Sequence, residues 1–338
     1  MSALARKSAL RLAAIAAASI ALIGASTFLG ETHIAFDDIF GAQPSVVFWQ
    51  LRVPRSLLAA AAGAALSIGG VLFQSLFRNP LATPYTLGID TGASLGAAVA
   101  FLSGVSGIWS LARIGDVEFG VARLSVFAFI GAMAALMVVL FMARLRGGQD
   151  ITHLLLAGVC VSYMSAAGIP LVMLLSNRPI TNDIVIWTMG SLEKASADAL
   201  AGMVQICCIA ALVLGYGVYH HRAVDLLSMG DDLAASRGVA VRRTVWTTAL
   251  LVGVLTAVTV ANCGPIGFIS LMVPHAARFI VGPHTLPRLI ASALLGGAFL
   301  ALCEGLTRTV GPRVVPVGVV TNLLGAAFFF FLLARSRR

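Results

Sequence analysis

Nine stretches of this chain contain no Asp, Glu, Lys or Arg, and most of them are long enough to cross a lipid bilayer. A helix rises about 1.5 Å per residue, so a hydrocarbon core of about 30 Å takes about 20 residues to cross. The stretches are residues 12–30, 56–77, 91–112, 124–143, 151–177, 199–221, 244–277, 289–303 and 314–334. With 59% hydrophobic and 11% charged residues, the chain cannot fold as a soluble globule. The pattern predicts an all-α, polytopic membrane protein.

One of these stretches, residues 244–277, is too long for a single crossing. It contains the sequence NCGPIG at residues 262–267, and a proline between two glycines breaks a helix. We therefore expect two spans there, at about 243–261 and 267–281. The chain then has ten transmembrane helices in a single domain, residues 1–338.

The distribution of basic residues predicts the orientation of these spans. Ten spans place both termini on one side of the membrane, where 15 of the 23 Lys and Arg residues then lie, against 8 on the other side. Because cytoplasmic loops are enriched in basic residues, we expect both termini in the cytoplasm. The same enrichment accounts for the net charge of +9. A role in binding nucleic acid is not needed to explain this charge, because no basic run carries interleaved aromatic residues for stacking on bases.

Small residues spaced four apart predict where helices pack closely. Gly63 with Ser67 and Gly92 with Gly96 each form such a pair within an uncharged stretch. Small side chains let helix backbones approach one another where lipid supplies no hydrophobic driving force.

The motifs of several enzyme classes are absent from the sequence. The two lysines, Lys7 and Lys194, do not follow glycine, so there is no Walker A motif for ATP, and HExxH is also missing. Residues 92–96 match the GxSxG of hydrolases, but they lie in an uncharged span rather than at a strand–turn–helix junction. Histidines and cysteines do not cluster at a ligand spacing. We therefore expect no catalytic residues, metal or cofactor.

The longest cytoplasmic loop, about residues 222–243, carries the signals of a short helix. Asp231 and Asp232 are acidic residues suited to a first turn, and Gly238 is suited to the end of a helix. We expect this helix at about 231–237, outside the membrane, where a soluble partner can dock on it.

Three arginines lie at the opposite, outer face. Arg52 and Arg55 precede the second span in the sequence LRVPR, and Arg308 follows the ninth. Glu304 lies four residues before Arg308, a spacing that favours an ion pair on a helix. Arginine pairs well with carboxylates, so these residues either anchor the helices at the interface or meet an acidic partner outside.

Nearly the whole sequence resembles the permease subunits of ABC importers for vitamin B12, iron–siderophore complexes and haem. Ten spans with both termini inside is also the topology of that family, the type II importer permeases. The resemblance is carried by LRVPR (51–55), RNPLATPYTLG (78–88), GASLGA (92–97), WTMGSL (187–192), MGDDLAASRG (229–238), GPIGFISLMVPHAAR (264–278) and VVPVGVVTNLLGAAFFFFLL (314–333).

The resemblance implies an assembly in the bacterial inner membrane. A second permease subunit, identical or paralogous, would complete a central path, two separate ATPase subunits would dock in the cytoplasm, and a periplasmic binding protein would deliver the cargo. The family's docking arginines correspond to Arg52, Arg55 and Arg308. Its coupling-helix positions correspond to Gly230, Asp231, Asp232, Ala234 and Gly238. Arg237 departs from the family, which usually has an apolar residue before the closing glycine.

The resemblance predicts the cargo, and residues that interrupt the spans predict its path. We expect an iron(III)–siderophore complex, the most widespread cargo of the family, with haem or cobalamin as alternatives. An ion-coupled secondary transporter is the rival class; such proteins carry ionisable residues deep within spans, where this chain has only Glu304 well inside one. The residues at two interruptions of the apolar spans, all of them polar except Met164, either line the path or only bond across helices. They are Ser162, Tyr163, Met164, Ser165, Thr321 and Asn322.

Overall fold

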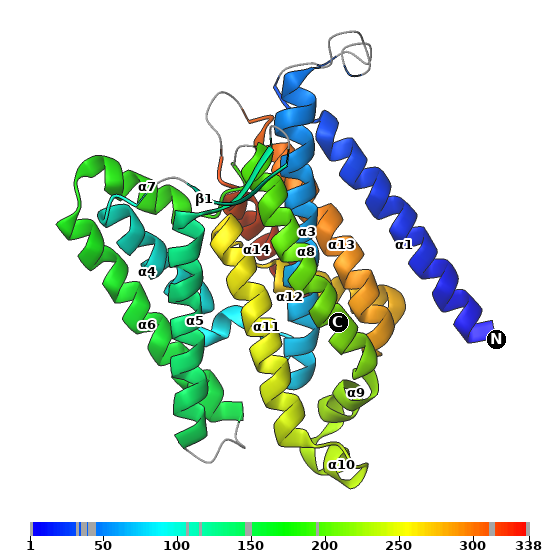
Figure 1. The fold of residues 1–338 in the computed structure, drawn as a ribbon. Helices are drawn as coiled ribbons and strands as arrows, with labels where there is room; N and C mark the ends of the chain where they lie inside the picture. The colour runs from blue at the N-terminus through cyan, green and yellow to red at the C-terminus, as the bar shows by residue number, and fades with distance from the viewer. Residues whose placement is uncertain are drawn as a thin grey trace.

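The computed structural model describes residues 3–31, 34, 39, 45–105, 108–114, 117–145, 151–193, 196–310 and 315–335. Within these residues, ten apolar helices form a bundle, and each corresponds to one predicted span (Figure 1). They are α1 (Ala3–Phe28), α3 (Val53–Leu76), α4 (Ile89–Leu102), α5 (Arg123–Leu145), α6 (Ile151–Leu175), α8 (Ser196–Tyr219), α11 (Val241–Cys263), α12 (Ile269–Val281), α13 (Thr285–Thr307) and α14 (Val317–Arg335). Eight are long enough to cross a membrane, and α4 and α12 are shorter.

Shorter elements connect these helices. Two antiparallel strands form a hairpin in which Ile108 lies opposite Ala122 and Ile114 lies opposite Val117. The connecting elements are the π-helix η1 (Val47–Arg52), the 3-10 helix η2 (Pro84–Leu87), the strands β1 (Ile108–Ile114) and β2 (Val117–Ala122), and the helices α7 (Arg178–Thr188), α9 (His221–Met229) and α10 (Asp231–Ser236).

The third span is shorter than predicted. The uncharged stretch 91–112 suggested one helix, but α4 ends at Leu102 and the chain then enters the hairpin. Gly104 adopts a left-handed conformation with φ +64°, and the Val105 N–H donates to the Ala100 carbonyl at 3.1 Å. This pattern is a Schellman motif, which satisfies the last carbonyls and stops the helix. The prediction of helix for the second half of this stretch was therefore wrong.

The second span begins earlier than predicted. The π-helix η1 runs directly into α3, so residues 47–76 form one continuous helical segment. Pro54 lies at the junction of the two elements, where the i→i+5 hydrogen bonds of η1 give way to the i→i+4 bonds of α3. Arg52 and Arg55 consequently lie on a helix and not in a loop before it.

The predicted break at NCGPIG is confirmed, and it contacts a second break in the bundle. Helix α11 ends at Cys263 and α12 begins at Ile269. The hydroxyl of Tyr85, in η2, donates to the Ile266 carbonyl at 2.9 Å and accepts from the Ile266 N–H at 3.1 Å. Backbone groups freed where a helix stops inside a membrane protein need such partners.

Small residues bring helix backbones together at the two predicted pairs. An added Cβ on Gly63 would overlap the Gly296 carbonyl oxygen, so α3 and α13 touch through their backbones. An added Cβ on Gly92 would lie 2.7 Å from the Gly131 oxygen, so α4 and α5 also approach closely. Helix α3 lies at the centre of the bundle and packs against α8, α11, α12 and α13 (Figure 1).

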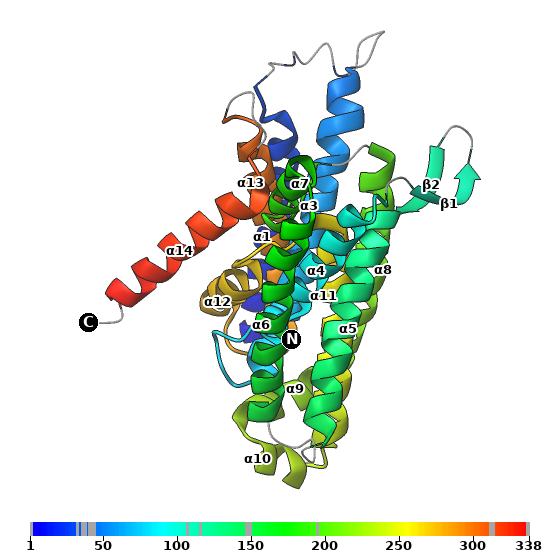
Figure 2. The same cartoon turned by 90° about the vertical axis from the view of Figure 1, so that its left-hand side faces the viewer.

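The bundle has two distinct ends. The carbonyl of Phe28, at the end of α1, accepts a hydrogen bond from Arg52, so α1 starts at the opposite end, where α9 and α10 lie (Figure 1). Helix α14 also starts near Arg52 and leans away from the bundle (Figure 2). We call the Arg52 end outer and the α9–α10 end inner, following the orientation that the arginine count predicts.

Candidate functional site

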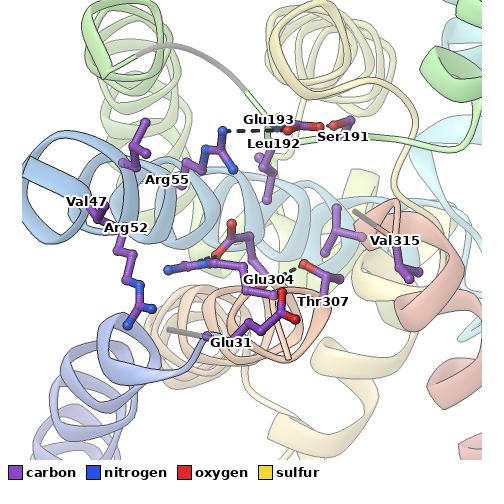
Figure 3. A pocket seen from close by; sticks show the side chains of 14 residues that line it. Glu31, Val47, Arg52, Arg55, Ser191, Leu192, Glu193, Glu304, Thr307 and Val315 are labelled. Atoms are coloured by element: carbon purple, nitrogen blue, oxygen red, sulfur yellow. Dashed lines mark hydrogen bonds and ion pairs between the residues drawn. The ribbon is translucent and has the colours of Figure 1, made fainter. Parts of the chain in front are cut away.

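The three predicted outer arginines gather around one pocket. This pocket has a volume of about 220 Å³ and lies between the outer ends of α3 and α13, the segment after α7 and the start of α14 (Figure 3). Three carboxylates line it together with the arginines, so its wall carries charges of both signs. The charged lining residues are Glu31, Arg52, Arg55, Glu193, Glu304 and Arg308.

Arg308 is held by its own helix and by α3. Its Nε donates to the Glu304 carboxylate at 2.8 Å, and its Nη2 contacts the same oxygen. Nη2 also donates to the Ser56 hydroxyl at 2.8 Å. The predicted i,i+4 ion pair is therefore formed, with side chains only 12% and 5% exposed. Because burial reduces screening, this pair fixes Arg308 more firmly than a surface pair would.

Arg52 and Arg55 differ in their surroundings although they lie one turn apart. Arg52 is only 4% exposed, and its Nη1 donates to the Phe28 carbonyl at 3.2 Å, which joins α3 to α1. Arg55 points towards Glu193 at 3.9 Å, and its Nε has no hydrogen-bond partner in the described structure (Figure 3). Arg308 likewise keeps an Nη1 without a hydrogen-bond partner among the described residues, and both of these nitrogens are buried. Arg55 has the most exposed side chain of the three, at 18%, and the longer ion pair, so it has the most remaining capacity to bind a carboxylate.

The predicted loop helix is present at the inner end as α10, one residue shorter than expected. Gly230 and Gly238 bracket it with φ values of +145° and +81°, which side chains rarely adopt. Ala234 is fully buried against the bundle, whereas Asp232 and Arg237 are exposed. The exposed side of α10 thus carries Asp232 together with the apolar Leu233, and Arg237 caps its end.

Two contacts that the sequence did not predict tie this loop to the bundle. Asp231 pairs with Arg78, just after the end of α3, at 2.6 Å between Oδ1 and Nη2. In α9, Asp225 accepts hydrogen bonds from the Thr285 N–H at 2.8 Å and from its hydroxyl at 2.5 Å, and so caps α13. Movement of α9 and α10 would therefore act directly on α3 and α13.

The predicted path residues divide into two groups. Tyr163 and Met164 on α6 are 75% and 69% exposed, and Asn322 on α14 is also exposed. Ser165 and Thr321 are buried, and Ser162 is half-buried with its hydroxyl donating to the carbonyl one turn earlier. In this conformation, only the first group lies on a surface that a second subunit or a cargo could reach.

Comparison with known proteins agrees with this arrangement. The model of the FecCD transport family matches residues 17–335. The hemin transport system permease protein HmuU of Yersinia pestis is 32% identical over 320 residues, which cover 92% of this chain and 91% of HmuU. The Fe(3+) dicitrate transport system permease protein FecD of Escherichia coli is 35% identical over 298 residues, covering 88% of each chain.

A solved structure extends the likeness to three dimensions. A metal-chelate type ABC transporter in an inward-facing conformation superposes with a TM-score of 0.83 and 26% sequence identity. The match covers 96% of this chain and 98% of that chain. The ten apolar helices, the motifs along the chain and these relatives agree: the chain belongs to the FecCD transport family and is an ABC-importer permease.

Proposed function

We propose that this chain forms half of the membrane path of a bacterial inner-membrane ABC importer for an iron(III)–siderophore complex. A periplasmic binding protein docks on the outer pocket, and two separate ATPase subunits dock on the α10 loops of two permease subunits. One observation carries this proposal: an arginine-lined pocket lies at the outer ends of α3 and α13, and the loop helix α10, with a glycine on each side, lies at their inner ends.

The charge of the outer pocket supports docking through carboxylates. Arg308 is already neutralised by Glu304, and Arg52 is buried against α1. Arg55 lies 3.9 Å from the Glu193 carboxylate, and its side chain is 18% exposed against 12% for Arg308. A carboxylate of a binding protein therefore gains most from Arg55, because arginine presents several donors to one acidic group.

The contacts of the inner loop support its coupling role. ATP-driven closure of the ATPases would shift α10, and the Asp231–Arg78 and Asp225–Thr285 contacts connect this loop to α3 and α13. Those two helices carry the outer arginines, so displacement at one end reaches the other through rigid, packed helices. The exposed Asp232 and the capping Arg237 present charges of both signs on this side of α10, towards its ATPase.

Polar groups on the surface of the spans support a path between two copies. Asn322 and the Tyr163 hydroxyl would be costly to expose to hydrocarbon. A partner subunit or a water-filled path avoids that cost. Helix α14 leans away from the bundle (Figure 2), and only 22% of its residues 317–334 are buried, so most of its surface is available to a second subunit.

The choice of an iron chelate as cargo follows from the names of the relatives. FecD is named for Fe(3+) dicitrate, and the structural neighbour is a metal-chelate type transporter. HmuU is named for hemin, which makes haem the second candidate.

Reconstitution in liposomes tests the proposal. The chain, its ATPase and its binding protein would be assembled, and uptake of radiolabelled iron–siderophore, haem and cobalamin compared with and without ATP. We expect ATP-dependent iron–siderophore uptake that requires the binding protein. Uptake that follows a proton gradient and ignores ATP would instead assign the chain to the ion-coupled rivals.

A single charge reversal tests the docking site within the same assay. We expect Arg55→Glu to weaken binding-protein affinity by about tenfold or more, the effect of placing like charges across an interface. Arg178→Glu is the matched control, because Arg178 is exposed at the start of α7 and lies outside the pocket. Equal affinity of both variants would remove Arg55 from the docking site. Arg52 is less suitable for reversal, since it is buried.

A further inference from the structure

A second basic cavity lies at the inner end of the bundle. It has a volume of about 260 Å³ and opens between α3, α9, α12 and α13. Arg78, Arg278 and Arg288 line it, together with the polar side chains of Gln74, Ser75 and Ser228. Neither the outer pocket nor the exposed face of α10 includes this cavity.

Arg288 is the buried member of this group. It is 6% exposed, and its Nη2 donates to the Val71 carbonyl at 3.3 Å and to the Ser75 hydroxyl. Its Nε is buried and has no hydrogen-bond partner within the described part of the chain. A buried guanidinium without a carboxylate partner is costly, so a bound anion would stabilise it.

The charges around Arg288 leave it without full neutralisation. Arg278 lies close enough to repel it electrostatically, while Asp225 attracts it. That carboxylate already accepts two hydrogen bonds from Thr285, and Asp231 is paired with Arg78. The cavity therefore keeps an excess of positive charge.

We propose that this cavity binds the phosphate of an anionic phospholipid of the cytoplasmic leaflet. Arginine forks match phosphate geometry, and basic pockets between spans on the cytoplasmic side suit lipid headgroups. Phe279 and Ile280, which follow Arg278 on α12, are 72% and 41% exposed. They provide apolar surface beside the cavity for an acyl chain.

The position of the site gives the lipid a place in the coupling path. Arg78 lines the cavity and also pairs with Asp231 of α10. A phosphate in the cavity would therefore lie beside the contact that joins the loop helix to α3.

Thermal unfolding of the full chain in detergent tests this site. We expect dioctanoyl phosphatidylglycerol to raise the melting temperature saturably, and dioctanoyl phosphatidylcholine and sodium phosphate to have little effect. Arg278→Gln should require about tenfold more phosphatidylglycerol for the same shift, because one charge-assisted hydrogen bond is lost. Arg222→Gln is the matched control, since Arg222 is exposed on α9 and does not line the cavity.

A second variant keeps the test decisive if Arg278→Gln does not fold. Ser228 is exposed at the cavity wall, so Ser228→Glu places a competing carboxylate there without disturbing the core. We expect it to abolish the response to phosphatidylglycerol. An unchanged response in the folded cavity variants would overturn the site. Equal protection by phosphatidylcholine would overturn its selectivity for anionic lipid, and equal protection by inorganic phosphate would overturn the lipid as its ligand.

Discussion

The contact between α3 and α13 predicts a large effect from adding a single methyl group. In Gly63→Ala, the new Cβ would overlap the Gly296 carbonyl oxygen and lie 2.8 Å from the Leu300 Cβ. The second distance alone is about 0.6 Å shorter than the 3.4 Å at which ordinary contact begins. Neither neighbour is the flexible end of a side chain, so the helices must separate. Overpacking of this kind costs about 1–3 kcal/mol.

The separation should also be felt at the outer pocket. Arg308, which caps the end of α13, donates to Ser56 on α3 at 2.8 Å, a bond that depends on the distance between these two helices. We therefore expect Gly63→Ala to lower both the free energy of unfolding and the affinity for the binding protein.

Unfolding in detergent at increasing denaturant would measure the stability change of this variant. Gly215→Ala is the matched control, because Gly215 lies in α8 with no atom within 4 Å of an added Cβ. It should be as stable as the parent chain or more so by about 0.5–1 kcal/mol, since alanine favours helix over glycine. Equal stability of Gly63→Ala and Gly215→Ala would refute the close contact of α3 with α13.

Two further substitutions test the interior contacts by the same unfolding measurement. Glu304→Ala leaves the guanidinium of Arg308 buried without its carboxylate and should lower the free energy of unfolding by about 3 kcal/mol or more. Ser56→Ala removes one hydrogen bond and should lower it by about 1 kcal/mol. Similar losses in both variants would argue against a buried ion pair. Tyr85→Phe removes both hydrogen bonds to the Ile266 backbone and should cost about 1–3 kcal/mol. The control Tyr163→Phe, on a residue 75% exposed, should change stability by less than about 0.5 kcal/mol.

Local signals in the sequence predicted much of this architecture. Uncharged stretches located all ten apolar helices, and the NCGPIG break at residues 262–267 separated α11 from α12 because it acts on the backbone where it stands. Gly230 and Gly238 bracket the predicted loop helix for the same reason. The end of α4 was missed, because an uncharged stretch shows where a helix can run and not where Gly104 stops it.

Contacts between distant segments had no comparable signal. Asp225 and Thr285 are 60 residues apart, and nothing near either residue in the sequence identifies the other. Helix α9 could have been found, since Val224 and Leu227 place two buried apolar residues on one helical face. The unequal availability of Arg52 and Arg55 depends on Phe28 and Glu193, which only the fold brings near them.

The central claim is that energy reaches this bundle from a separate ATPase through α10, and a photo-crosslink tests it directly. Ala235 is exposed on α10, so benzoylphenylalanine at this position would face the ATPase without use of the native cysteines. In membranes that also contain the ATPase, irradiation should capture a peptide of that chain, identified by mass spectrometry. The same probe at Val204, 49% exposed on α8, should capture none. An ATPase captured equally from both positions, or from neither, would contradict the account.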